Sequence, residues 1–261
     1  MPFETKFFDI EKSLRYPYPP DSKEMPIASW DKFGVPEQLH IVLNGLHAFW
    51  AKNKRIPRPL NVDDASSLKA LVKEYLANKM EVEGEDFKVE SVDDKLIENV
   101  SLYADSQISP CNSFWGGIIC QEIVKLTGKF TPLKQWLHHD FFECLPEGTV
   151  TRKVVSDRYY DTRVIFGEEF LEKALKSSSF VIGAGALGCE FIKMFALMGF
   201  STKGGKCTVT DDDNIEISNL NRQFLFRREH VGKNKCETAC GVGKKMNKDV
   251  NFEALQARVS P

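Results

Sequence analysis

The sequence predicts an α/β protein of two domains, with a parallel sheet in the second half of the chain. Short apolar strands there stand before and after a glycine-rich turn and a helix, which is the order of a strand–helix–strand unit. In the first half, apolar residues recur at three- and four-residue spacing, which predicts helices. The 261 residues are 42% hydrophobic and 28% charged, an ordinary globular composition that excludes a disordered or fibrous protein.

Three helices are expected in the first 103 residues. The first begins at Pro36, a residue that suits the first turn of a helix, and is stopped by Pro57. The second is capped by Asp63 and Asp64 and carries apolar residues on one face. A third, weaker helix runs from about Asp93 to Tyr103. The chain before Pro36 is rich in proline and aromatic residues and is expected to be extended.

A fourth helix and a strand are expected to complete the first half. Ser113 caps this helix and Gly128 ends it. Because Gly116 and Gly117 inside a helix each cost about 1 kcal/mol relative to alanine, we expect another backbone or a ligand to approach them closely, and close packing is favoured. The aromatic-rich residues 133–145 read as a strand, which makes the first half mixed α/β.

A turn-like break over Pro146–Thr149 marks the expected boundary between residues 1–150 and residues 151–261. The first part has 17 basic and 23 acidic residues, and the second has 18 basic and 14 acidic residues. The modest basic excess of the second part suits a small anionic ligand better than nucleic acid, for which a strong excess is expected.

Several features bear on the cellular setting. No apolar run approaches the roughly 20 residues that span a membrane, and the N-terminus lacks the pattern of a signal peptide. The seven cysteines are scattered without a C-x-x-C pair, so reduced thiols and no metal site are expected. We therefore expect an intracellular protein without membrane or nucleic-acid partners. His40 and His138 lack a partner in a recognisable catalytic motif and are expected to be structural or exposed.

The most informative segment begins with the apolar strand Phe180–Ile182, which runs into a G-x-G-x-x-G motif. The motif's glycines are Gly183, Gly185 and Gly188. A helix follows, and a second strand ends at Asp211, 23 residues after the last of these glycines. This pattern predicts nucleotide binding, because glycines let the backbone approach the ligand and a helix N-terminus attracts phosphate. An acid at the end of the second strand accepts hydrogen bonds from ribose hydroxyls.

The chain after Asp211 argues against a dehydrogenase. A nicotinamide-binding enzyme needs one acid and then an ordinary helix, but here a long polar segment supplies amides, Arg222 and Lys235. A guanidinium and an ammonium suit a triphosphate, since they neutralise its oxygens as pyrophosphate leaves. A nicotinamide- or flavin-linked oxidoreductase stays open as an alternative that rests on the glycine motif alone.

Longer motifs resemble the ubiquitin-activating enzymes. The second half resembles their active adenylation domain over Gly183–Glu190, Thr210–Glu216, Ser218–Arg227 and Gly232–Lys235. The first half resembles the C-terminal part of their inactive adenylation domain, through Trp30–Phe33, Pro36–His40, Gly116–Gly117, Gln121–Glu122, Gly128–Pro132, Gln135–Leu137 and Glu143–Pro146.

This resemblance implies a Rossmann-like adenylation fold of the ThiF/MoeB type, in two partial domains. Residues 1–150 would be the C-terminal part of the inactive domain, and residues 151–261 the N-terminal part of the active domain. The family adenylates the C-terminal carboxylate of ubiquitin or a ubiquitin-like modifier with ATP and Mg2+, and then forms a thioester on a cysteine. A cytoplasmic and nuclear location is implied.

The resemblance also implies roles for single residues. Those expected to bind the nucleotide are Gly183, Gly185, Ala186, Gly188, Asp211, Asp213, Asn219, Arg222 and Lys235. Asp211 would contact the ribose, while Arg222 and Lys235 would bind phosphates and are the catalytic candidates. Arg158 is not expected to be catalytic, and no residue of this chain is expected to hold a metal.

Two departures from the family pattern limit these expectations. Asp212 makes a third consecutive acid where the family usually has a less acidic residue. The family's later magnesium-binding aspartate, catalytic-cysteine domain and ubiquitin-fold domain are missing, so a ubiquitin-conjugating enzyme would bind only through missing domains. The isolated chain is therefore expected not to catalyse ATP–pyrophosphate exchange, and Cys189 is not expected to be the nucleophile. A non-catalytic binding scaffold is the alternative.

Overall fold

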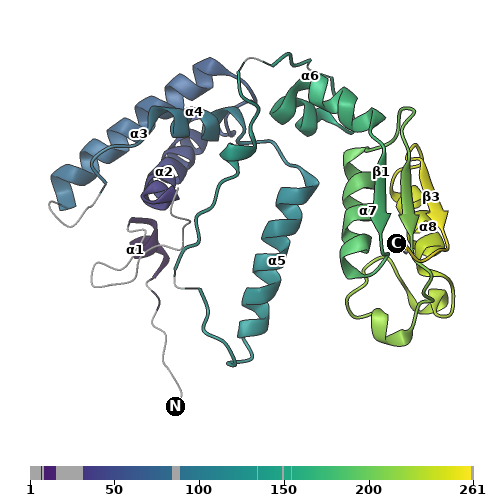
Figure 1. The fold of residues 1–261 in the computed structure, drawn as a ribbon. Helices are drawn as coiled ribbons and strands as arrows, with labels where there is room; N and C mark the ends of the chain where they lie inside the picture. The colour runs from purple at the N-terminus through teal and green to yellow at the C-terminus, as the bar shows by residue number, and fades with distance from the viewer. Residues whose placement is uncertain are drawn as a thin grey trace. The chain divides into compact units, whose positions relative to one another are not determined.

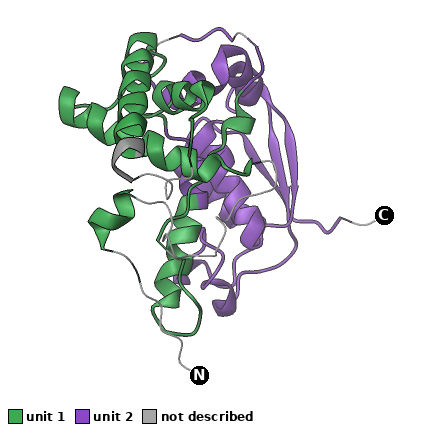
Figure 2. Ribbon diagram, turned by 90° about the vertical axis from the view of Figure 1, so that its left-hand side faces the viewer, with its two compact units in different colours: residues 1–106, 115–145 green, residues 107–114, 146–261 purple. Residues whose placement is uncertain are grey.

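The computed structural model describes residues 7, 9–15, 32–83, 89–133, 135–148, 150–153 and 155–259. The chain divides into two units, shown in different colours in Figure 2. Unit 1 comprises residues 1–106 and 115–145, and unit 2 comprises residues 107–114 and 146–261. Much of the segment before Pro36 lies outside the described residues, as does part of the Trp30–Phe33 motif.

In the described residues up to Lys125, the helices follow one another along the chain as labelled in Figure 1. They are α1 (Ile10–Arg15), α2 (Val35–Asn53), α3 (Val62–Glu83), α4 (Asp94–Leu102) and α5 (Ser109–Lys125). The helix expected from Pro36 is confirmed as α2, and the one expected near Asp93 is confirmed as α4, with the Asp93 side chain accepting from Lys95 N. Residues 10–15 form a helix, so the extended conformation expected there was wrong.

The core of unit 1 lies among α2, α3 and α4. Ile41, Phe49, Leu68 and Ile97 are all fully buried and belong to one apolar cluster. This is the outcome expected of helices whose apolar residues recur every three or four positions, because each helix presents one apolar stripe to its neighbours.

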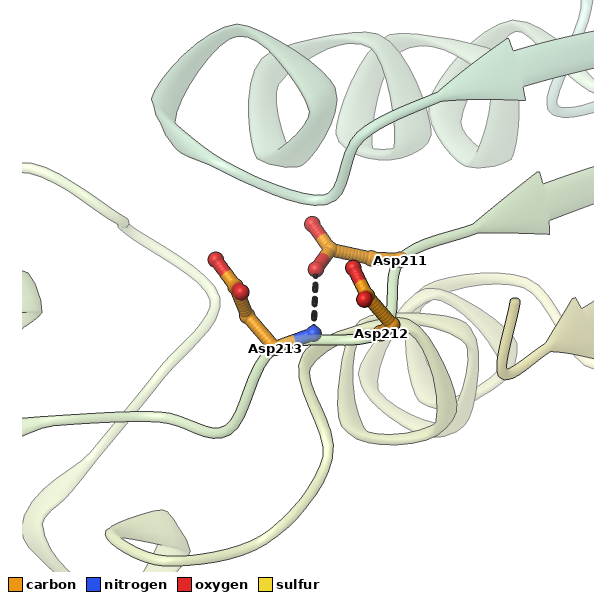
Figure 3. Close-up of side chains that lie close together, drawn as sticks. All are labelled: Asp211, Asp212 and Asp213. Carbon is orange, nitrogen blue, oxygen red and sulfur yellow. Dashed lines mark hydrogen bonds between the residues drawn. The ribbon is translucent and has the colours of Figure 1, made fainter. Parts of the chain in front are cut away.

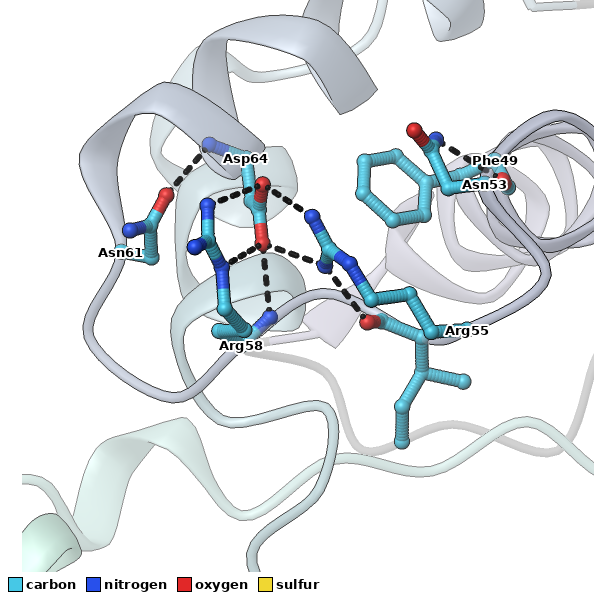
Figure 4. Close-up of polar contacts among 7 residues, drawn as sticks. Phe49, Asn53, Arg55, Arg58, Asn61 and Asp64 are labelled. Carbon is cyan, nitrogen blue, oxygen red and sulfur yellow. Dashed lines mark hydrogen bonds and ion pairs between the residues drawn. The ribbon is translucent and has the colours of Figure 1, made fainter.

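The connection between α2 and α3 is closed by an ionic cluster around Asp64 (Figure 4). The cap of α3 is Asn61, whose Oδ1 accepts from Asp64 N at 2.8 Å, so the expected capping by Asp63 and Asp64 was wrong. The Asp64 carboxylate instead accepts from Arg55 Nη1 at 2.6 Å and from Arg58 Nε at 3.0 Å. Hydrogen bonds from these arginines lower the pKa of Asp64.

A buried histidine pair joins three segments of unit 1. His40 Nδ1 lies 3.1 Å from His138 Nε2, and His40 Nε2 lies 2.9 Å from the carbonyl oxygen of Leu14 in α1. The carbonyl is an acceptor, so His40 carries its proton on Nε2 and His138 donates to His40 Nδ1. Burial lowers the pKa of both histidines to about 4.

Three expectations for residues 109–145 were wrong. The helix α5 begins at Ser109, so Ser113 lies inside it, and an added Cβ at Gly116 or Gly117 would meet no atom of the described residues within 4 Å. Residues 133 and 135–145 contain no strand, only a short 3-10 helix at Phe142–Cys144. A strand needs a partner for its backbone hydrogen bonds, and the described part of unit 1 offers no other strand.

Unit 2 carries the parallel sheet. Its elements are α6 (Tyr160–Lys176), β1 (Ser179–Ile182), α7 (Ala186–Met198), β2 (Cys207–Thr210), α8 (Lys235–Met246) and β3 (Phe252–Leu255). The strands lie in the order β1–β2–β3, all parallel, with Val181 opposite Val209 and Val209 opposite Ala254. The strand–glycine turn–helix–strand unit expected from Phe180 to Asp211 is therefore confirmed.

The core of unit 2 lies under α7 and α8, which contact each other and the sheet (Figure 1). Ile192, Val209, Phe226 and Phe252 are among its buried side chains. Among the residues that the structure describes, no helix combines the length and the apolar character that crossing a membrane requires.

Candidate functional site

The glycine motif forms the turn between β1 and α7. Gly183 has φ +91°, in the left-handed region that favours glycine, and Gly185 directly precedes the first residue of α7, Ala186. A Cβ at Gly188 would lie 2.0 Å from the carbonyl oxygen of Gly183, so only glycine fits there. These glycines bring the N–H groups of the first turn of α7 to the carboxyl end of β1, an arrangement that attracts anions.

Asp211 follows β2 and ties its loop to the glycine turn. Its Oδ2 accepts from Ala184 N at 2.7 Å, and its Oδ1 accepts from Asp213 N at 2.9 Å. Figure 3 shows this carboxylate directed toward the turn between β1 and α7. Each carboxylate oxygen can accept a second hydrogen bond, so Asp211 keeps acceptor capacity for ligand hydroxyls.

Asp213 and Lys235 meet although 22 residues separate them. Lys235 is the first residue of α8, and its Nζ lies 2.7 Å from Asp213 Oδ2. The hydrogen bond from Lys235 lowers the pKa of Asp213. The Lys235 side chain is 11% exposed and the Asp213 side chain 57% exposed, so a buried ammonium faces an exposed carboxylate.

Asn219 and Arg222 belong to the polar loop between β2 and α8. The buried Asn219 follows Ile217 and Ser218 in a short 3-10 helix, and its Oδ1 accepts from Glu216 N at 2.9 Å. The exposed Arg222 donates from Nη1 to the carbonyl oxygen of Ser218 at 2.8 Å. The structure thus brings the glycine turn, Asp211, Asp213 and Lys235 together, whereas the hydrogen bonds of Arg222 to described residues stay within its own loop.

Three consecutive carboxylates raise the question of a resident cation. Oxygens of Asp211, Asp212 and Asp213 lie within 4.8 Å of one another (Figure 3). Asp213, however, pairs with Lys235, Asp212 pairs with Arg258 at 3.3 Å, and Asp211 accepts from two backbone N–H groups. These partners already supply the positive charge that a metal would bring, so the three acids do not fit a resident Mg2+.

The thiol of Cys189 lies inside the core of unit 2. It is fully buried, and burial raises its pKa to about 11. A nucleophilic cysteine acts as the thiolate, and a thiol with so high a pKa stays protonated at neutral pH. Cys189 is therefore a packing residue.

Asn234 belongs to this site, yet no role was expected for it. Its Nδ2 donates to the carbonyl oxygens of Asp211 and Asp213, and its Oδ1 accepts from Glu237 N at the start of α8. An asparagine just before a helix is a common cap, and that signal was present in the sequence. The hydrogen bonds that its amide donates to the acidic loop could be recognised only from the three-dimensional structure.

Two protein families match separate parts of the chain. Residues 157–261 match the ThiF family, and residues 1–76 match the ubiquitin-activating enzyme E1 four-helix bundle. Among solved structures, that of Escherichia coli MccB with ATP is 26% identical and covers 45% of this chain and 35% of its own, with a TM-score of 0.38.

Curated relatives match over most or all of the chain. The human ubiquitin-like modifier-activating enzyme 1 is 38% identical over 268 residues, which cover 100% of this chain and 24% of that protein. The ubiquitin-activating enzyme E1 1 of Arabidopsis thaliana is 39% identical, covering 92% of this chain and 22% of that protein. The chain thus spans about a quarter of the length of these relatives. Over its whole length the chain is similar to part of the ubiquitin-activating enzymes, and its second half has a ThiF-type α/β fold.

Proposed function

We propose that this chain supplies most of an ATP-binding half-site in a ubiquitin-activating enzyme. The observation that carries the proposal is the meeting of the glycine turn, Asp211 and Lys235 beyond the carboxyl ends of β1 and β2, which is where open α/β sheets bind ligands. Similarity to the ubiquitin-activating enzymes supports this assignment over the oxidoreductase alternative. The two relatives and the four-helix bundle family are named for modifier activation, and residues 157–261 match the ThiF family.

Within this half-site Asp211 would hold the ribose of ATP, and the glycine turn would lie against its phosphates. The turn has no side chains to obstruct the ligand, and Ala186 begins the helix whose N–H groups face it. Asp211 is already fixed by Ala184 N and Asp213 N, so its carboxylate would accept from ribose hydroxyls without reorganising.

Lys235 and Arg222 would neutralise the phosphates. In the reaction, a carboxylate oxygen of the modifier attacks the α-phosphorus, the bond from that phosphorus to the bridging oxygen breaks, and pyrophosphate leaves with the electron pair. Negative charge grows on the leaving group, and fixed cations stabilise it. The Lys235 ammonium has three donors and one carboxylate partner among the described residues, so a phosphate oxygen can join or replace Asp213. Mg2+ would arrive with ATP as part of the substrate.

The partners follow from the same proposal. The modifier is ubiquitin or a ubiquitin-like protein, and the enzyme acts in the cytoplasm and nucleus. Residues 1–150 correspond in this proposal to the C-terminal part of the inactive adenylation domain, and residues 151–261 to the N-terminal part of the active one. The match of residues 1–76 to the E1 four-helix bundle and of residues 157–261 to the ThiF family supports a division of the chain into two such parts.

Calorimetry on the 261-residue chain tests the proposal. ATP is expected to bind and NAD is not, and Lys235→Met is expected to weaken ATP binding by about tenfold or more, as for a lost charge-assisted contact. Lys206→Met is the matched control, since Lys206 pairs with Glu253 at 2.6 Å elsewhere in unit 2. Equal binding of ATP and NAD, or an equal loss in both variants, would overturn the assignment.

A further inference from the structure

Asn234 stands between the two elements that carry the proposed ribose and phosphate contacts. On one side its Nδ2 donates to the carbonyl oxygens of Asp211 at 3.2 Å and Asp213 at 3.3 Å. On the other side its Oδ1 accepts from Glu237 N at 3.2 Å and from Cys236 Sγ at 3.0 Å. The two donor hydrogens and the acceptor of the amide are therefore all used, and they bridge the acidic loop to the start of α8.

The backbone around this amide supports the same bridge. Asn214 and Asn234 form an isolated antiparallel pair, and Lys235 N donates to the carbonyl oxygen of Asp213 at 2.9 Å. The acidic loop and the start of α8 thus run side by side for a few residues. The side chain of Asn234 extends this pairing back to Asp211, which the backbone pairing does not reach.

We propose that Asn234 is a positioning residue, which fixes the separation between the ribose acid Asp211 and the phosphate lysine Lys235. This inference rests on the function proposed above and adds a residue to it. Ribose and phosphates are joined in one ligand at a set distance, so a site whose acid and cation are held at that separation before binding avoids the cost of ordering them.

The residue type fits this role. Serine and aspartate cap helices about as well as asparagine, and threonine somewhat less well, because a cap needs only an acceptor. None of them offers two N–H donors to the carbonyl oxygens of Asp211 and Asp213. Aspartate would also place a carboxylate against those two oxygens. Capping and bridging together therefore favour asparagine at position 234.

The test uses the full chain with Asn234→Ser, which keeps the cap and removes the donors, and Asn234→Asp as a second variant that caps α8 strongly. Asn251→Ser is the matched control, because Asn251 Nδ2 donates to the carbonyl oxygen of Gly205 at 3.0 Å, away from the site. For each variant we would measure the dissociation constants of ATP and adenosine, and the hydrogen-exchange rates of the Asp213 and Lys235 amides without ligand.

Asn234→Ser is expected to weaken ATP binding about five- to tenfold, in line with the loss of one or two amide–carbonyl hydrogen bonds, with a smaller effect on adenosine. The Asp213 and Lys235 amides are expected to exchange about tenfold faster than in the wild type, while Asn251→Ser leaves them unchanged. Asn234→Asp is expected to weaken ATP binding and to speed exchange of the two amides more strongly. If Asn234→Ser does not fold, Asn234→Asp alone tests the positioning role.

Opposite results separate the two claims. A wild-type chain that does not bind ATP rejects the proposed function, and the positioning role falls with it. A wild-type chain that binds ATP, with both Asn234 variants matching it in affinity and in amide exchange, rejects the positioning role and leaves the proposed function standing. An equal loss in Asn251→Ser also rejects it, because the effect would then be one of general stability.

Discussion

The two units each hold an ion pair at the start of a helix, and the two pairs are built in opposite ways. In unit 1 the carboxylate of Asp64 is 7% exposed, while its partners Arg55 and Arg58 are 39% and 58% exposed. In unit 2 the cation is the buried member, with Lys235 11% exposed and its partner Asp213 57% exposed. The enclosed member is therefore the anion in unit 1 and the cation in unit 2.

This difference separates a structural contact from a binding contact. Asp64 accepts five hydrogen bonds from Arg55 and Arg58, so its carboxylate has little capacity left for another ligand. Lys235 has one carboxylate partner among the described residues, and that partner is solvated. An anionic ligand can therefore compete for Lys235, but no cation can reach Asp64 without breaking the connection between α2 and α3.

Acid should affect unit 1 first, and this is the largest effect that we expect. The neutral forms of His40 and His138 are favoured in the fold, with pKa values of about 4 against about 6.5 when unfolded. The unfolded state therefore binds more protons between these values, and stability is lost as the pH falls from 6.5 to 4, by on the order of 3 kcal/mol for each histidine.

Urea unfolding followed by tryptophan fluorescence measures this effect, because all four tryptophans fall within the residue ranges of unit 1. Hydrogen exchange of the β2 amides reports on unit 2 in the same samples. A urea midpoint for unit 1 that stays constant between pH 7 and pH 4.5 would show that the histidine pair is not buried in its neutral form.

Removing the enclosed anion should be the next largest effect. Asp64→Ala is expected to lower the free energy of unfolding of unit 1 by about 2 kcal/mol, less than for a fully buried pair because the two arginines stay solvated. Asp94→Ala is the control, since the pair of Asp94 with Lys69 is exposed on both sides and is expected to contribute little to stability. An equal decrease in the free energy of unfolding in the two variants would show that the Asp64 carboxylate is no more important to unit 1 than an exposed one.

Asp211→Asn should weaken binding of ATP and adenosine alike. The variant removes the charge that faces ribose and places an amide beside Ala184 N. We expect about a tenfold loss for both ligands, the range for one charge-assisted hydrogen bond. Competition binding with the two ligands checks this expectation. A loss for ATP alone would assign Asp211 to the phosphates, contrary to the division of roles between Asp211 and Lys235.

The smallest effect concerns α8, which carries Lys235. An added Cβ at Gly241 meets no atom within 4 Å, so Gly241→Ala is expected to stabilise unit 2 by about 0.5–1 kcal/mol and to leave ATP affinity unchanged. Gly188→Ala is the opposite case, because its Cβ would strike the carbonyl oxygen of Gly183. Hydrogen-exchange rates of the β2 amides measure the stability of both variants. Destabilisation by Gly241→Ala would contradict the open space beside Gly241 on α8.

What could be predicted from the sequence was local. The strand, glycine turn, helix and second strand from Phe180 to Asp211 follow one another directly, so periodicity and spacing were sufficient. The helix begun by Pro36 and the helix begun by Asp93 carry their start signals beside them. The nucleotide-binding roles expected for the glycines, Ala186, Asp211, Asp213, Asn219, Arg222 and Lys235 all stay predictions.

The failures involve partners that are distant in sequence. Residues 133–145 have the composition of a strand, but composition does not say whether another strand lies alongside. The contact of His40 with His138 spans 98 residues, and the contact of Lys235 with Asp213 spans 22. Such pairs depend on how helices and loops are placed in three dimensions, and no local pattern encodes that placement.

The most direct test of the central claim is a titration of the isotope-labelled 261-residue chain with ATP, followed by the NMR signals of its backbone amides and of the Lys235 ammonium. Saturable shifts are expected for the amides from Gly183 to Gly188, for Asp211 and Asp213, and for Lys235, with the amides around Asp64 in unit 1 unchanged. An absence of saturable shifts at the glycine turn and Lys235, or equal shifts around Asp64, would contradict the assignment of the nucleotide to unit 2.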